Sequence, residues 1–530
     1  MGYGVRVHYF NTAGPCIPGL HYMLPAAARL PEALPLIEGW QYFIVHAPRQ
    51  TGKTTTLAAL AAQLTADGRH VALRLSCERA EAWGDDIEAA ELAVLDAIRG
   101  EAMARQLPSE FLPPDPWPAA SPGSRLYAGL QDWAAGCPLP LVLFFDEIDA
   151  LRGQSLISVL RQLRDGFTIH PQAFPASVVL CGLRDIRDYK AAAGGDPNRL
   201  GTASPFNVAV ESLRIRDFTA DEVAALYKQH TSETGQEFTL DAITRAFALT
   251  QGQPWLVNAL AREVTQKMGI KPPNPVTADH LETAKERLIL ARATHLDSLV
   301  SKLAEPRVRR VIEPLVAGTL PGNVDDVYED DVSYVRDLGL IARTKPIRVA
   351  NPVYREVIMR VLGAGFEDLI SAEPARFLLP DGRLDFRLLI EKFAAFWIAD
   401  GEILAETRYY SEAAAQLVFT AFLQRVVNGG GFVDREYGIG RGRIDLLVRK
   451  PYGDGCLQRE AVELKVWQPR KADPLAQGLA QLDGYLDRLG LDTGTLIIFD
   501  RRPDAAPVTE RTAITRVDSP ADRAIILLRA

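Results

Sequence analysis

The stretch Ala47–Thr54 carries residue types that can hold a polyphosphate. It reads APRQTGKT, which is most of the pattern G-x-x-x-x-G-K-[ST], with Ala47 at the position of the first glycine. Gly52 permits a tight turn, after which backbone N–H groups and a helix N-terminus face an anion. Lys53 can reach the β- and γ-phosphates, and the Thr54 hydroxyl can bind Mg²⁺. This spacing predicts a binding site for ATP and Mg²⁺.

The residues on either side of this motif are typical of a strand–loop–helix unit. Residues 42–45 are aromatic and β-branched, as expected for a buried strand. From Thr55 to Leu64, apolar residues recur at helical spacing. A chance Gly-Lys-Thr at a helix start is the alternative, and the strand–loop–helix context argues against it. Thr55, in the first turn, is counted among the predicted nucleotide-binding residues.

An acidic pair follows a second apolar run. Residues 139–145 are almost wholly apolar and lead into Asp146 and Glu147. Such a run is typical of a buried parallel strand, whose carboxyl end faces the ligand in an α/β sheet. In that position Asp146 would hold Mg²⁺ and Glu147 would polarise the attacking water.

A further strand is predicted at 177–183 and leads into Arg184. In P-loop ATPases the residue after this strand often senses the γ-phosphate, so we expect this role for Arg184, with Arg187 as the alternative. Strands alternate with helices throughout this part of the chain, which predicts a parallel sheet with right-handed crossovers.

Two acids and a lysine are predicted on neighbouring strands nearer the C-terminus. Asp445 lies between apolar residues, and Glu463 and Lys465 alternate with apolar residues. Alternation places Glu463 and Lys465 on one face of a strand, where burial without a partner is costly. Asp445 and Glu463 are hard oxygen ligands suited to Mg²⁺, and Lys465 could orient water and stabilise phosphorane charge. The alternative is a surface ion pair on a half-exposed sheet.

Helical patterns connect these two regions. Thr219 and Glu222 have capping-box spacing, and an apolar helix is predicted to start near Pro254. Residues 296–365 predict three helices and two short strands around a turn, as in a winged helix. The acidic residues at 325–331 would be repelled by phosphate, which favours internal packing or contact with a partner over DNA binding for this segment.

The predicted organisation is therefore an α/β multidomain chain. It has an ATPase domain with a parallel sheet at 1–210, a helical lid at 211–295, a winged helix at 296–365, a joint at 366–400 and a metal-binding α/β domain at 401–530.

Composition limits the setting of this protein. The chain has 530 residues, a formal net charge of −8 and an apolar content of 47%. The negative charge argues against a strongly basic nucleic-acid coat, although a local basic groove stays open. The five cysteines are scattered without paired spacing, which favours a cytoplasmic setting. We find neither a membrane-spanning apolar run nor a secretion signal in the sequence.

The N-terminal motifs together resemble the STAND-like branch of the AAA+ superfamily. The resemblance rests on His46–Thr56, on Leu141–Asp149 and on the turn Gly252-Gln253-Pro254, and it covers residues 1–360. It implies a regulated ATPase switch in which Pro254 lies against the adenine and couples the nucleotide state to the lid and winged helix.

The C-terminal third resembles the PD-(D/E)xK nuclease superfamily. The motif falls on Asp445, Glu463 and Lys465, with Ile444 in place of the proline of the family name. The resemblance implies that Glu412, on a preceding helix, and Gln481, in a Gln-x-x-x-Tyr helix, also lie at the metal site.

We therefore expect an ATPase that gates or drives a Mg²⁺-dependent DNA nuclease, with ATP and DNA as partners and no membrane. The architecture suggests prokaryotic genome defence or mobile-element biology. A signalling switch whose C-terminal domain binds nucleic acid or protein without cleavage is the main alternative, and a DNA translocase is a third. Self-association on activation is left open, because no arginine finger acting in trans can be assigned.

Overall fold

The computed structural model describes residues 8–25, 27–183, 206–291, 294–317, 326–367, 374–401, 413–427, 431–439, 442–453 and 456–530. The chain forms two compact units. The first comprises Met1–Asp297, Ser333–Thr344 and Ala350–Val353, and the second comprises Ser298–Val332, Lys345–Val349 and Tyr354–Ala530.

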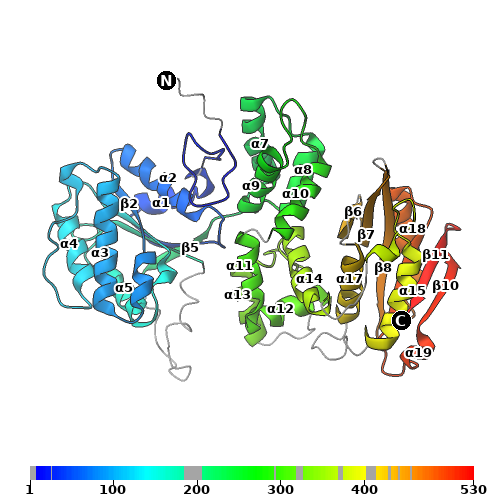
Figure 1. Ribbon diagram of the computed structural model, residues 1–530. Helices are drawn as coiled ribbons and strands as arrows, with labels where there is room; N and C mark the ends of the chain where they lie inside the picture. Colours follow the sequence, from blue (N-terminus) through cyan, green and yellow to red (C-terminus); the bar gives the residue numbers. More distant parts are fainter. Residues whose placement is uncertain are drawn as a thin grey trace. The chain divides into compact units, whose positions relative to one another are not determined.

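A parallel five-stranded sheet forms the centre of the N-terminal part, as the alternation of strands and helices predicts (Figure 1). Its order is β2-β3-β4-β1-β5, so β4 lies between the strand before the phosphate-binding motif and the strand before the acidic pair. The strands are β1 (Tyr42–His46), β2 (Val71–Ser76), β3 (Leu141–Asp146), β4 (Ser177–Gly182) and β5 (Ala209–Arg214).

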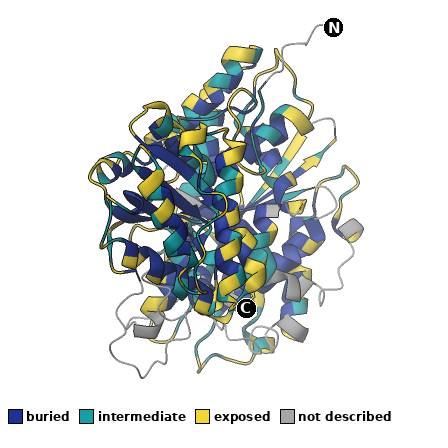
Figure 2. Cartoon of the chain, turned by 90° about the vertical axis from the view of Figure 1, so that its left-hand side faces the viewer, coloured by how far each residue is buried: buried dark blue, intermediate teal, exposed yellow. Residues whose placement is uncertain are grey.

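Helices cover both faces of this sheet, because alternate residues of each strand enter different cores. Tyr42 and Ile44 of β1 pack in one apolar cluster, and Phe43 and Val45 pack in another. Figure 2 shows this end of the chain with its buried and exposed residues. The helices are α1 (Ala33–Glu38), α2 (Lys53–Ala66), α3 (Ile87–Ala104), α4 (Arg125–Gly136) and α5 (Gly153–Gly166).

The sheet extends beyond the predicted boundary at residue 210. Ala209–Arg214 is the edge strand β5 and pairs in parallel with β1, whereas the sequence suggested that helical structure begins here. The reason is that an edge strand needs few apolar residues: Val210 and Glu211 are exposed, and Leu213 is buried. Residues 211–214, which were predicted to belong to the lid, continue this strand.

The predicted lid is helical. Thr219 and Glu222 form the expected capping box at the start of α7, and Pro254 is the first residue of α9. The helices are α7 (Ala220–Thr234), α8 (Leu240–Thr250), α9 (Pro254–Arg262) with the π-helical turn Glu263–Lys267, and α10 (Ala278–Leu290).

The segment predicted as a winged helix is mainly helical. Its helices are α11 (Thr294–Leu303), α12 (Pro306–Ala317), α13 (Asp326–Asp337) and α14 (Pro352–Glu367). The two expected strands are reduced to single bridge positions at Ile341 and Val349, with the N–H of Ala350 donating to the carbonyl of Leu340 over 2.9 Å. Pro346 lies between these positions and lacks an N–H for a longer ladder.

A mixed six-stranded sheet dominates the second unit, in the order β10-β11-β9-β8-β7-β6. Pairs β6–β7, β7–β8 and β10–β11 are antiparallel, and β8–β9 and β9–β11 are parallel. The strands are β6 (Phe432–Ile439), β7 (Gly442–Tyr452), β8 (Cys456–Trp467), β9 (Gly494–Asp500), β10 (Ala513–Asp518) and β11 (Ala524–Arg529). The helices are α15 (Phe386–Phe396) with the π-helical turn Trp397–Gly401, α17 (Ala413–Val427), α18 (Leu475–Leu489) and α19 (Val508–Arg511).

Helices lie on the two faces of this sheet as well. Leu496 and Ile498 of β9 pack in an apolar cluster with residues of α18. On the other face, Phe499 of β9 contacts Phe393 of α15, which in turn contacts Phe419 of α17. β8 and β9 therefore lie between two helical layers.

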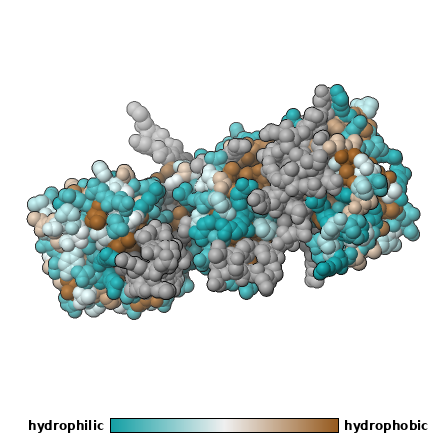
Figure 3. Space-filling model, turned by 90° about the horizontal axis from the view of Figure 1, so that it is seen from below, coloured by the Kyte–Doolittle hydropathy of each residue, from teal (hydrophilic) through white to brown (hydrophobic). Residues whose placement is uncertain are grey.

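On the face seen from below, the described residues are mostly hydrophilic or intermediate in hydropathy (Figure 3). Figure 3 shows teal residues over most of the described part of one face, with scattered apolar ones. None of the helices in the described residues is long and apolar enough to cross a membrane.

Candidate functional site

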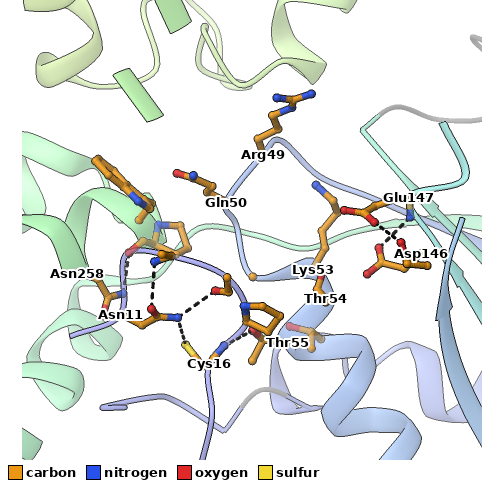
Figure 4. Close-up of a pocket in the computed structure, with 18 of the residues that line it drawn as sticks. Asn11, Cys16, Arg49, Gln50, Lys53, Thr54, Thr55, Asp146, Glu147 and Asn258 are labelled. Atoms are coloured by element: carbon orange, nitrogen blue, oxygen red, sulfur yellow. Dashed lines mark hydrogen bonds between the residues drawn. The ribbon is translucent and has the colours of Figure 1, made fainter. Parts of the chain in front are cut away.

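A cavity of about 800 Å³ lies in the first unit, where the loop after β1 meets the end of β3 (Figure 4). Its lining includes the N-terminal arm at residues 11–24, the phosphate-binding motif, the end of β2 with Arg74 and Ser76, the acidic residues at the end of β3 and the start of α9. The predicted residues that line it are Gly52, Lys53, Thr54, Thr55, Asp146, Glu147 and Pro254.

The phosphate-binding motif turns at Gly52, as predicted. Gly52 has φ 88°, and a Cβ atom there would lie 2.9 Å from Nη1 of Arg29, so the position requires glycine. Helix α2 begins at the next residue. The ammonium of Lys53 donates to the carbonyls of Ala47 (2.7 Å) and Pro48 (2.8 Å) within the same loop. Burial lowers the pKa of Lys53, which is consistent with an ammonium that needs anions or carbonyls around it.

Asp146 at the end of β3 and Glu147 directly after it each accept a hydrogen bond from β2. Oδ2 of Asp146 is 3.0 Å from Nη1 of Arg74, and Ser76 donates from its hydroxyl to Oε2 of Glu147. Asp146 is fully buried, and its Oδ1 accepts from the N–H of Glu147 over 3.1 Å. Burial raises the pKa of Glu147. A carboxylate next to the cavity with a raised pKa is a candidate for proton transfer or for polarising water.

The opposite end of the cavity is less polar and is formed by the lid and the arm. Pro254 starts α9, and Trp255 and Asn258 of the same helix also line the cavity. The indole N–H of Trp255 donates to the carbonyl of Thr12 (2.9 Å), which joins the arm to the lid. Tyr22 of the arm is another lining residue. An apolar wall of this kind suits a nucleobase.

The residues present fit Mg²⁺ bound together with a nucleotide. Thr54 and Asp146 line the same cavity and would hold the ion. No group of three His, Cys, Asp or Glu side chains in the described residues could hold a metal by itself. Mg²⁺ bound with a nucleotide commonly takes one or two carboxylates, and phosphates and waters complete its coordination. The ion would supply charge neutralisation on the phosphates.

The predicted γ-phosphate sensor cannot be placed. Arg184 and its alternative Arg187 lie outside the described residues. Sequence reasoning also missed Arg74 and Ser76, although a signal was present: they are polar residues two apart in an otherwise apolar strand, and so they share a face.

The second unit brings Asp445, Glu463 and Lys465 together. β7 and β8 pair Leu446 with Val462, which places the adjacent Asp445 and Glu463 side by side. Oδ2 of Asp445 accepts from the N–H of Leu464 (2.8 Å), and Nζ of Lys465 is 2.6 Å from Oε1 of Glu463. These contacts confirm the predicted strand alternation.

Glu463 is 2% exposed, so this is not a surface ion pair. Its second carboxylate oxygen, Oε2, is buried without a hydrogen-bond partner. Burial, and next the charge of Asp445, raises the pKa of Glu463 to about 7. A buried carboxylate oxygen of this kind is a donor atom that Mg²⁺ could use, so the residues fit the predicted ion.

The sequence predicted two further ligands of this ion, Glu412 and Gln481. Glu412 lies outside the described residues, and Gln481 is an exposed residue of α18. The buried side of α18 is formed by other residues, among them Leu482 and Leu486, which pack on the sheet.

Part of the chain is similar to a known protein family. Residues 34–173 match the family model of the AAA ATPase domain. The phosphate-binding motif and the acidic pair both lie inside this segment, which is similar to an AAA ATPase domain. No curated protein matches the chain.

Solved structures resemble the chain at low identity. The Walker-type ATPase PABY2304 of Pyrococcus abyssi is 14% identical with a TM-score of 0.47, and the match covers 66% of this chain and 99% of that one. The Aeropyrum pernix ORC1 protein, solved in complex with DNA, is 15% identical with a TM-score of 0.35, and the match covers 64% of this chain and 93% of that one. The Thermotoga maritima RuvB Holliday junction branch migration motor is 17% identical with a TM-score of 0.32, and the match covers 63% of this chain and 92% of that one. At this level the similarities carry no argument about function.

Proposed function

We propose that the first unit binds and hydrolyses ATP and that this reaction gates or drives a Mg²⁺-dependent nuclease in the second unit. The observation that carries the ATPase part is a single cavity lined by Lys53, Thr54, Asp146 and Glu147. Lys53 would supply a positive charge for the phosphates, and Thr54 and Asp146 would supply two ligands for magnesium. Glu147 would supply a base for the attacking water.

The chain's own groups divide the work of hydrolysis. Lys53 would transfer its hydrogen bonds from the carbonyls of Ala47 and Pro48 to the phosphates. Glu147 would orient the attacking water and accept its proton, once its carboxylate is released from the hydroxyl of Ser76. Pro254 and Trp255 would cover the base.

The nuclease part rests on the arrangement of Asp445, Glu463 and Lys465. Two carboxylates on adjacent strands can share one divalent cation, and a lysine at 2.6 Å from one of them supplies positive charge for a phosphodiester oxygen. DNA is the proposed substrate, and self-association on activation remains a proposal.

A contact inside the first unit supports the gating part. Gly339, in the turn after α13, packs so closely on Pro48 that a Cβ atom on Gly339 would lie 2.7 Å from Cγ of Pro48. The carbonyl of Pro48 accepts from Lys53. A nucleotide that moves Lys53 would therefore disturb this turn, which belongs to the segment predicted as a winged helix.

The test is incubation of the purified full chain with linear and circular DNA and Mg²⁺, with and without ATP. We expect cleavage that requires ATP and that is lost in Lys465→Ala and in Asp445→Asn. Both variants should still hydrolyse ATP, because the changes lie outside the nucleotide cavity. Cleavage by Lys465→Ala at the wild-type rate would exclude this site.

A signalling switch that binds nucleic acid or protein without cutting is the second candidate. It is favoured by the small number of acids: no three His, Cys, Asp or Glu side chains cluster as metal ligands in the described residues. Wild-type ATPase activity without cleavage of any DNA substrate in Mg²⁺ or Mn²⁺ would support this candidate.

A further inference from the structure

Two residues of β2 hold the two acids that follow β3. Because strand side chains alternate, Arg74 and Ser76 project from the same face. The register pairs Ser76 with Asp146, so the ends of the two strands are level. Arg74 then contacts the carboxylate of Asp146, and Ser76 contacts that of Glu147. The role of Arg74 is the question that the proposed ATPase function leaves open.

Arg74 has more hydrogen-bonding capacity than its contact with Asp146 uses. Its Nη1 is 3.0 Å from Oδ2 of Asp146, and its Nε is buried without a hydrogen-bond partner. The side chain is 17% exposed and lines the same cavity as Lys53 and Thr54. A guanidinium has five N–H donors and is suited to bind a phosphate through two of them.

Asp146 is also the carboxylate that would hold Mg²⁺ under the proposed function. Oδ2 of Asp146 would then contact the ion, and its contact with the guanidinium of Arg74 would be lost. A guanidinium that loses its carboxylate in a largely buried position is unfavourable unless another anion replaces it. In this cavity the available anion is the polyphosphate of the nucleotide.

We propose that Arg74 is a phosphate-binding residue with two alternative partners. It pairs with Asp146 when no nucleotide is bound, and it binds the terminal phosphate of a nucleoside triphosphate when Asp146 holds the metal. Arg74 thereby distinguishes ATP from ADP within one chain, without an arginine from a second copy. This inference rests on the proposed nucleotide site.

The experiment measures the dissociation constants of ATP and ADP for the full chain in Mg²⁺ by titration calorimetry. In Arg74→Met, ATP should bind about 10- to 100-fold more weakly, because a charge-assisted hydrogen bond is lost. ADP binding should stay near the wild-type value, so the ratio of the two constants shrinks. A wild-type ratio in the folded variant would overturn the proposal.

Two further variants make the result decisive. Arg125→Met is the matched control, because Arg125 forms a similar ion pair with Glu88 (2.6 Å) and does not line the cavity; its ratio should not change. Arg74→Gln keeps an N–H donor for Asp146 and removes the positive charge. It should show the same loss of ATP preference, and it decides the question if Arg74→Met does not fold. If the wild type binds neither nucleotide, the proposed function itself fails; if it binds both and Arg74→Gln keeps the ratio, only this inference fails.

Discussion

The two candidate sites hold their acids in opposite ways. At the nucleotide cavity, Asp146 ends a parallel strand and Glu147 follows it, and each receives a hydrogen bond from the neighbouring strand β2. At the second site, Asp445 and Glu463 lie beside each other on antiparallel strands, with Lys465 bound to one oxygen and another oxygen without a partner.

The difference concerns what each site requires from a ligand. The nucleotide cavity is balanced by its own side chains, so a ligand has to replace existing contacts, and binding can be coupled to movement. At the second site, one carboxylate oxygen of the buried Glu463 has no hydrogen-bond partner, and a proton or a divalent cation would relieve this cost. One site is thus suited to switching, and the other to retaining a cation.

The strongest test of this comparison exchanges a lysine at each site. Lys53→Ala should reduce ATP hydrolysis by about a hundredfold or more, because a positioned charge on the phosphates is removed. Lys465→Ala should leave ATP hydrolysis unchanged and abolish DNA cleavage. Steady-state phosphate release and a gel assay measure the two activities. Loss of ATP hydrolysis in Lys465→Ala would contradict the separation of the two sites.

A glycine tests whether the lid wall of the nucleotide cavity is as rigid as its contacts imply. Gly252 has φ 80°, and a Cβ atom there would lie 1.9 Å from the carbonyl oxygen of Phe218. Gly252→Ala should therefore destabilise the protein by about 3 kcal/mol, measured by denaturant unfolding. Gly235 is the matched control, since it has φ 74° and open space around its Cβ position, and its change to Ala should cost about 1 kcal/mol. Equal effects would mean that the close contact is unimportant.

Neutralising one acid at each site should change stability in opposite directions. Burial raises the pKa of Glu463 to about 7 from its ordinary value of 4.5, so its ionised form is disfavoured by folding. This cost is absent below pH 4.5 and is complete above about pH 7. At pH 8 without metal, Glu463→Gln should therefore stabilise the second unit by about 1–3 kcal/mol.

Asp146→Asn should destabilise the first unit by about 1–3 kcal/mol at the same pH, because Arg74 loses its charged partner. Thermal unfolding of both variants at pH 8 provides the measurement. Destabilisation by Glu463→Gln would show that its contact with Lys465 outweighs the cost of burial.

The smallest expected effect is a pH dependence confined to the first unit. Burial lowers the pKa of His295 to about 4 from 6.5, and its ring lies 4.9 Å from that of Trp255. Folding favours the neutral form, so this stability is present above pH 6.5 and is lost as the pH falls toward 4. The loss should be about 1 kcal/mol at pH 5.5. His295→Phe should flatten this part of the pH–stability curve, and an unchanged curve would contradict the assignment.

Local patterns in the sequence were sufficient for the elements of both sites. The strand, turn and helix around Gly52, the strand before Asp146 and the helix start at Pro254 are confirmed. Each depends on periodicity or turn chemistry over a few residues, which a single sequence contains. The same holds for the alternation that puts Glu463 and Lys465 on one face.

Side-chain contacts between neighbouring strands were not predictable from such local patterns. Arg74 meets Asp146 because β2 and β3 are neighbours in the order β2-β3-β4-β1-β5, and this order is not given by the order in the chain. The edge strand β5 was missed because a strand with one covered side needs little apolar pattern. Gln481 was assigned by motif alone; it is an exposed residue of α18, and its role as a ligand stays a prediction.

The N-terminal arm has a mechanical consequence. It is bonded to the lid at several points: Tyr22 donates to Glu233 (2.6 Å), the N–H of Met23 donates to Gln229 (3.2 Å), and Thr12 accepts from Trp255. The arm also contacts helix α2, because the N–H of Cys16 donates to the hydroxyl of Thr55 (3.0 Å). We therefore expect the arm to move together with the lid. A rotation of the lid then becomes a displacement at Thr55, one residue from the threonine that would hold the metal.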